Sequence, residues 1–112
     1  MTMLKGPNVL IFASEAGSAA NLSAVIQSNK ERASFRVFGT KVGLKVFDSN
    51  NIETQHVSLG KQLDDARRLL TDERPDVLLI GRCIDSNSHE RALVKIARQT
   101  GIPSVSIVDE WY

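Results

Sequence analysis

The stretch "DVLLIGRC" (76–83) decides the fold. Four apolar side chains in a row lie between Asp76 and Gly81. A run this short and this uniformly apolar predicts a strand that is buried on both faces, as strands of a parallel sheet are. The next stretch, "SNSHERALVKIARQTG" (86–101), predicts an amphipathic helix that stops at Gly101. A buried strand that leads into such a helix is the repeating unit of an α/β domain.

The same alternation runs along the whole chain. Strands are predicted at 8–14, 33–40, 52–59, 76–83 and 102–112, and helices at 18–30, 41–51, 61–75 and 86–101. We therefore expect a three-layer Rossmann-like α/β domain with a five-stranded parallel sheet. Right-handed crossovers leave two common strand orders, 3-2-1-4-5 and 2-1-3-4-5. We favour 3-2-1-4-5, because it pairs the two most apolar strands at the centre and leaves the polar third strand at an edge.

Helical spacing also predicts which side chains face the core. A face is recognised where apolar residues recur three or four positions apart. The residues predicted to point inward are Leu22, Val25 and Ile26 in the first helix, Val42, Val46 and Phe47 in the second, Leu63, Ala66 and Leu70 in the third, and Leu93, Ile96 and Ala97 in the fourth.

Composition excludes several classes of function. The chain has 112 residues and is expected to form one domain, 1–112. Its 14 basic and 13 acidic residues are interspersed, so no basic footprint for nucleic acid is expected. No stretch reaches the roughly 18 apolar residues of a membrane span, and the N-terminus does not resemble a signal peptide. The single cysteine, Cys83, permits no disulfide within the chain and favours a reduced, cytoplasmic setting.

Open parallel sheets bind ligands beyond the carboxyl ends of their strands, near the point where the strand order reverses. This rule selects the loops after each predicted strand, and above all the crevice between the first and fourth. The predicted ligand-binding residues are Ser14, Glu15, Gly17, Ser18, Gly39, Thr40, Arg82, Ser86 and Asp109. No catalytic residue is assigned, and whether the protein is an enzyme is left open.

The first of these loops lacks the patterns that hold nucleotide cofactors. A dinucleotide fingerprint needs three glycines at GxGxxG spacing, whereas Gly17 stands alone, and no GxxxxGK[ST] motif is present. We therefore expect no NAD, FAD or ATP bound by these routes, and no cofactor. Glu15 would oppose a phosphate, but its carboxylate suits a sugar hydroxyl. The alternative is a simple strand-to-helix turn, with Gly17 present for backbone freedom.

The loop "GRCIDSNSHE" (81–90) admits two interpretations. Arg82, Ser86 and the following helix N-terminus suit an anion, but helix capping explains the same residues. Asn87, with Glu90 three positions later, resembles a capping box. Cys83 is a candidate nucleophile with no marked histidine partner.

Metal binding is weakly supported by the sequence. The two histidines, His56 and His89, are far apart, and the chain has no CxxC or HxxxH pattern. We therefore expect no metal site. Two alternatives stay open: His89 acting as an acid or base, and Mg²⁺ held with a ligand phosphate by Asp85, Asp109 and Glu110.

Three stretches carry a family resemblance. "RPDVLLIGRC" (74–83), "ERALVKIARQTGIPSVSIVDEWY" (90–112) and "VFGTKVGLKVFDSNNIETQHV" (37–57) resemble the first Rossmann-like domain of nucleotide-sugar-processing proteins. These are the two-domain glycosyltransferases and the sugar-nucleotide 2-epimerases. The resemblance implies a domain of a carbohydrate-processing enzyme that binds a nucleotide sugar or phosphorylated sugar. It also implies that the chain is the N-terminal part of a longer one, because the family binds the donor nucleotide mainly with a second domain.

The end of the sequence bears on partners. Trp111 and Tyr112 follow a predicted buried strand directly, and aromatic side chains at such a place usually pack against something. We expect them to cover a groove of this domain, to contact the missing second domain, or to contact a second subunit in a homodimer. The alternative function is a non-catalytic Rossmann-like module that acts through protein–protein contacts.

Overall fold

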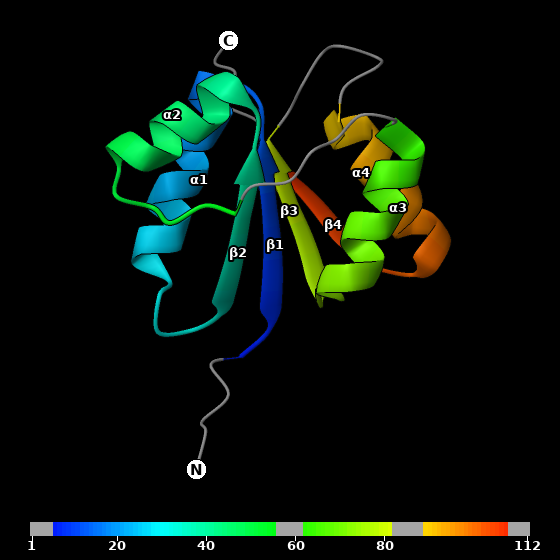
Figure 1. Cartoon of the computed structure of the whole chain (residues 1–112). Helices are drawn as coiled ribbons and strands as arrows, with labels where there is room; N and C mark the ends of the chain where they lie inside the picture. Colours follow the sequence, from blue (N-terminus) through cyan, green and yellow to red (C-terminus); the bar gives the residue numbers. More distant parts are fainter. Residues whose placement is uncertain (1–5, 56–61, 82–88, 108–112) are drawn as a thin grey trace, which may run out of the picture.

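The structure is a computed structural model, and it describes residues 6–55, 62–81 and 89–107. Strands and helices alternate along most of this part of the chain (Figure 1). Its elements are β1 (Asn8–Ala13), α1 (Ala16–Ser28), β2 (Ser34–Gly39), α2 (Lys41–Ser49), α3 (Gln62–Glu73), β3 (Val77–Gly81), α4 (His89–Thr100) and β4 (Ser104–Ile107). All four predicted helices are present, each within three residues of its predicted bounds. No helix among the described residues is long and apolar enough to cross a membrane.

The four strands form one parallel sheet in the order β2-β1-β3-β4. Phe12 lies opposite both Phe38 of β2 and Ile80 of β3, which places β1 at the centre. These strands are the predicted first, second, fourth and fifth, and the two most apolar runs are neighbours as expected. The parallel α/β fold is therefore confirmed, whereas the prediction of five strands is wrong for the described residues, which contain four.

The strand predicted at 52–59 accounts for the difference. Its described half, 52–55, follows a turn in which Asn51 has a φ of 59°, and it is not a strand of the sheet. The Gln55 N–H donates one hydrogen bond to the Val37 carbonyl, 2.7 Å away, so the segment does lie beside the β2 edge. Its alternating polar side chains leave it little apolar surface to bury. Burial therefore does not offset the conformational entropy lost in forming a full ladder of strand hydrogen bonds. Residues 56–59 lie outside the described part.

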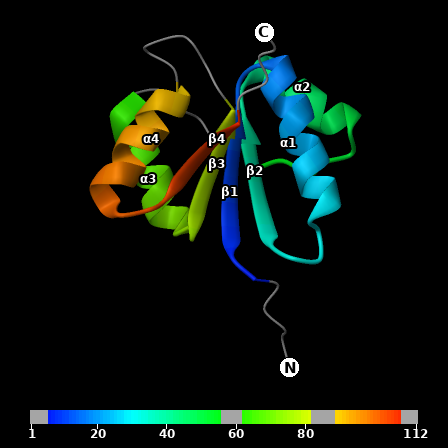
Figure 2. The same cartoon turned by 180° about the vertical axis from the view of Figure 1, so that it is seen from behind.

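Helices cover both faces of the sheet, with α1 and α2 on one side and α3 and α4 on the other (Figures 1 and 2). Side chains of a strand alternate between faces, and β1 shows this directly. Val9 and Ile11 pack in the cluster under α1 and α2, whereas Leu10 and Phe12 pack in the cluster under α3 and α4. A strand buried on both faces is what its unbroken apolar run predicted.

Two of the inward predictions are wrong. Val42 is 50% exposed and Leu63 is 44% exposed, although Phe47, Ala66 and Leu70 of the same helices are buried. Both exposed residues belong to the first turn of their helix, α2 and α3. Helical periodicity gives the direction in which a side chain points, but not how far the surface opposite it extends.

The predicted stop of α4 is confirmed. The helix ends at Thr100, Gly101 has a φ of 78°, and the Ile102 N–H donates to the Ala97 carbonyl at 2.9 Å. A left-handed residue at this position lets the backbone satisfy a helix carbonyl and turn into β4. The turn returns the chain to the sheet beside β3.

Candidate functional site

The strand order reverses between β1 and β3. From β1 the chain first adds β2 on one side, and it later returns to place β3 on the other side. The N-terminal ends of α1 and α4 lie at the same end of the sheet as the carboxyl ends of these two strands (Figure 1). Free backbone N–H groups and strand-end side chains therefore gather where such folds bind ligands. The predicted crevice corresponds to this place.

A carboxylate from α4 reaches the loop after β1. Glu90 Oε2 accepts hydrogen bonds from the Ser14 backbone N–H at 3.0 Å and from the Ser14 hydroxyl at 2.6 Å. Ser14 is half-buried, and Glu90 is only 2% exposed although it is an acidic residue. The pair joins segments 76 residues apart in the sequence and fixes the start of the β1–α1 loop against α4.

The other Glu90 oxygen, Oε1, is buried and accepts no hydrogen bond from any described residue. A buried carboxylate oxygen without a partner costs free energy, and native proteins contain few such atoms. The N-terminal turn of α4, in which Glu90 lies, offsets part of this cost through the positive end of the helix dipole. The arrangement is an acceptor group held in place beside the reversal point of the sheet.

The sequence alone did not predict this role of Glu90. The spacing of Asn87 and Glu90 resembles a capping box, and Asn87 lies outside the described residues. The signal was nevertheless available: Glu90 is three residues before Leu93 and seven before Ala97. These positions share one helical face, so a glutamate there is an acidic residue on an apolar face.

The predicted residues of the β1–α1 loop divide into two groups. Glu15 and Gly17 are exposed, and Glu15 occupies the N-cap of α1 without a side-chain capping bond. Ser18 is buried at 3% exposure and packs against Gly81 at the end of β3. A Cβ on residue 81 would come within 2.2 Å of the Ser18 Cβ. Gly81 therefore allows the first turn of α1 to approach β3 this closely.

Gly39 and Thr40 lie on the other side of β1. Gly39 pairs with Ala13 as the last residue of β2, and Thr40 forms the N-cap of α2. The Thr40 N–H donates to the Ala13 carbonyl at 3.4 Å. The structure thus joins Ser14 to Glu90 and places Ser18 against Gly81 at the end of β3, whereas Gly39 and Thr40 lie on the β2 side of β1.

His89, the first residue of α4, packs edge-on against Phe12, with 5.9 Å between the ring centroids and 63° between the ring planes. This contact gives the half-buried imidazole a packing role. The described residues contain no group of three or more side chains able to hold a metal ion. The remaining candidates lie outside the described residues: Arg82, Cys83, Asp85, Ser86, Asp109 and Glu110, with His56, Trp111 and Tyr112.

Comparisons with known proteins give similarity in structure. No family model and no curated protein matches the chain. UDP-GlcNAc 2-epimerase from Neisseria meningitidis, solved with UDP-GlcNAc bound, matches with a TM-score of 0.69 and 16% identity over 89% of this chain. A protein from Listeria monocytogenes assigned as a UDP-N-acetylglucosamine 2-epimerase matches with a TM-score of 0.69 and 14% identity over 91% of this chain.

A third structure, saccharopine dehydrogenase from Saccharomyces cerevisiae, gives a TM-score of 0.56 at 17% identity over 90% of this chain. The chain spans 31% of the Neisseria epimerase, 30% of the Listeria protein and 21% of the yeast enzyme. Similarity at these identities establishes the fold, and it agrees with the family resemblance found in the sequence. The chain is a Rossmann-like α/β domain whose fold is similar to that of a part of the UDP-GlcNAc 2-epimerases.

Proposed function

We propose that this chain is the small-molecule-binding domain of a carbohydrate-processing enzyme, with a nucleotide sugar or a phosphorylated sugar as its ligand. The observation that carries the proposal is the Ser14–Glu90 pair. A buried carboxylate, one oxygen of which has no hydrogen-bond partner among the described residues, is held at the reversal point of the sheet. The fold of this domain is similar to that of part of a protein solved with UDP-GlcNAc bound. We place the enzyme in the cytoplasm, in keeping with the single cysteine.

The chemistry of the crevice suits a sugar better than a bare phosphate on the β1 side. Glu15 and Glu90 both bring carboxylates to the β1–α1 loop and the start of α4. Carboxylates accept hydrogen bonds from hydroxyl groups and repel phosphate. We assign the sugar hydroxyls to this side, and the phosphate to Arg82 and Ser86 after β3. Glu90 acts as the positioning residue that holds Ser14 and the loop.

The test is thermal unfolding of the chain with UDP, GDP and CMP sugars. A ligand at 100 times its dissociation constant stabilises a protein by about 2.7 kcal/mol, which raises the Tm of a domain of this size by roughly 10 °C. No increase with any of these ligands, nor with sugar phosphates, would count against the proposal.

Variants then locate the site. Gly17→Val, Arg82→Ala and Glu15→Gln should each weaken binding. Gly17→Val adds a bulky side chain to the exposed first turn of α1, Arg82→Ala removes the proposed phosphate partner, and Glu15→Gln replaces a charged hydroxyl acceptor by a weaker neutral one. Glu31→Gln is the matched control, since Glu31 is an exposed glutamate beyond the other end of α1. Equal affinity in all four variants would place the ligand elsewhere on the protein.

A second candidate, a non-catalytic module that acts through protein contacts, is favoured by the exposure of β4. Within the described part of the chain this strand has a neighbour on one side only, and its Val105 is 52% exposed. An exposed edge strand is a ready surface for pairing. Sedimentation equilibrium of the wild type and of Val105→Lys separates the two candidates. A stable wild-type dimer that dissociates in Val105→Lys, together with no binding of a sugar nucleotide, supports the module.

A further inference from the structure

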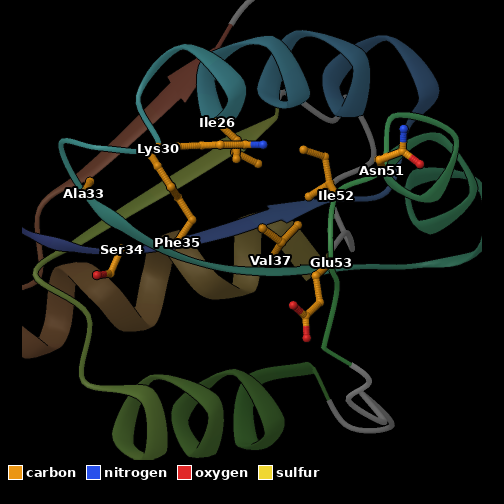
Figure 3. A pocket seen from close by; sticks show the side chains of 9 residues that line it. All are labelled: Ile26, Lys30, Ala33, Ser34, Phe35, Val37, Asn51, Ile52 and Glu53. Carbon is orange, nitrogen blue, oxygen red and sulfur yellow. The ribbon is translucent and has the colours of Figure 1, made fainter. Parts of the chain in front are cut away.

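A second hollow lies away from the carboxyl ends of the strands. A groove of about 480 Å³ runs between the C-terminal half of α1, the β2 strand and the segment that returns from α2 (Figure 3). Its lining includes Ser34 and Phe35, the first two residues of β2, whereas the Ser14–Glu90 pair lies at the opposite end of the sheet. We call it the Lys30 groove, after the one lysine among its described lining residues.

The floor of the Lys30 groove is apolar. Ile26, Val37 and Ile52 contribute to it, and each is at most 8% exposed. Phe35 is only half-buried, so part of its ring surface is open to a ligand. Small-molecule sites are usually hollows of roughly 300–1,000 Å³ with apolar lining and a few polar groups. The volume of the groove falls within that range, whereas its surface is mixed, with polar atoms contributing more of it than apolar atoms do.

The described lining residues carry one positive charge, on Lys30, and one negative charge, on Glu53. The Lys30 side chain extends along the groove beside Ile26 (Figure 3), so its carbon stem extends the apolar surface. Lys30 is exposed, and no described residue forms an ion pair or hydrogen bond with its ammonium group. An anion bound in the groove would therefore find a cation already in place beside an apolar surface.

Glu53, the carboxylate of the lining, does not neutralise Lys30. Figure 3 shows the Glu53 side chain directed away from Lys30. Its charge acts instead on Arg36: the hydrogen bond to Glu73 raises the pKa of Arg36, and the nearby Glu53 raises it further.

We propose that the Lys30 groove binds a small amphipathic anion. The apolar body of the ligand lies on Ile26, Phe35 and Val37, and its carboxylate or sulfonate pairs with Lys30. The proposal does not depend on the proposed function, because the two sites share no residue.

The probe is 8-anilinonaphthalene-1-sulfonate, whose fluorescence rises in an apolar site, compared with N-phenyl-1-naphthylamine, which has the same rings without the sulfonate. Folded wild-type protein should bind the anionic probe at one saturable site, and a UDP sugar should not displace it. Lys30→Met should lower the affinity for the anionic probe by up to roughly fivefold, which corresponds to the usual energy of a partly exposed ion pair. The affinity for the neutral probe should be unchanged. Lys30→Glu should weaken the anionic probe further.

Lys45→Glu is the control, because it changes the net charge by the same amount as Lys30→Glu does. Lys45 is an exposed lysine of α2 and is not among the lining residues. Amide shifts in ¹H–¹⁵N spectra should concentrate at Phe35, Val37 and Ile52. The proposal is overturned if wild type shows no saturable binding, if Lys30→Glu and Lys45→Glu bind the anionic probe equally, or if the shifts lie at Ser14 and Glu90 instead.

Discussion

Replacement of Gly81 by alanine tests how the start of α1 is seated against the sheet. The new Cβ would lie 2.2 Å from the Ser18 Cβ and 2.5 Å from its Oγ, far inside van der Waals contact. Both residues are buried, so neither can turn into solvent. Overpacking of this kind typically costs about 1–3 kcal/mol, and the entropic benefit of replacing glycine recovers only about 0.4–1 kcal/mol of it. We expect Gly81→Ala to be destabilised by about 2 kcal/mol.

The partner residue makes the prediction specific. Ser18→Ala keeps the Cβ that causes the closest contact, so it should not relieve Gly81→Ala. Ser18→Gly removes both offending atoms and leaves the Ser18 Cα, 3.5 Å away, as the nearest atom. By itself Ser18→Gly should cost about 1 kcal/mol as a helical glycine. In that background the further cost of Gly81→Ala should nearly vanish, which is a coupling energy of about 2 kcal/mol.

Urea unfolding of the four proteins in the cycle, followed by circular dichroism at equal m-values, measures this coupling. The reasoning is refuted if Gly81→Ala stays within 0.5 kcal/mol of wild type, about the limit for independent sites. It is equally refuted if Ser18→Ala rescues as well as Ser18→Gly does. Either result would mean that α1 does not lie against the end of β3 as described.

Three further predictions concern the site and the core. Ser14→Ala removes the 2.6 Å hydroxyl donor to Glu90, so chemical unfolding should show a loss of about 1.5–3 kcal/mol, and a loss under 0.5 kcal/mol would contradict a buried bond. Phe47→Ala empties a fully buried position under α1 and α2 and should cost about 3–5 kcal/mol, whereas unchanged thermal stability would place α2 elsewhere. Glu73→Gln breaks the 2.7 Å pair with the half-exposed Arg36 and should cost under about 1 kcal/mol. The pKa of Arg36 is raised, so the contribution of its positive charge to stability is lost only above the ordinary arginine range. The difference in unfolding free energy between Glu73→Gln and wild type should therefore not vary from about pH 6 to about pH 9.

Local patterns were sufficient to predict most of the elements. The run Val77–Ile80 specified a strand buried on both faces, and Gly101 marked the end of α4, because each follows from the geometry of a few neighbouring residues. The prediction of a strand was wrong over residues 52–55, because a strand needs a hydrogen-bonded partner along its whole length. Strand propensity does not show how many backbone hydrogen bonds the neighbouring strand can offer. The predicted burial of Val42 and Leu63 was wrong for a related reason, since the extent of the surface opposite a helix is a property of the assembled domain.

The candidate site divides in the same way. The sequence selected the β1–α1 loop and the crevice beside it, because the alternation of strands and helices fixes which strand ends face a ligand. It could not select Glu90, whose hydrogen bonds join residues 76 positions apart. The sequence likewise could not predict the Lys30 groove, because the groove forms only where α1, β2 and the segment that returns from α2 meet.

The sequence by itself determined the alternating α/β plan, the parallel sheet with its central apolar strands, and the end of the sheet at which to look. These follow from hydrophobic period, turn residues and crossover handedness, which act over short stretches of chain. Only the tertiary structure decided which carboxylate is buried, which glycine must stay a glycine and where a second hollow opens. Those features depend on distances between residues remote in sequence, and such distances exist only once the helices have packed on the sheet.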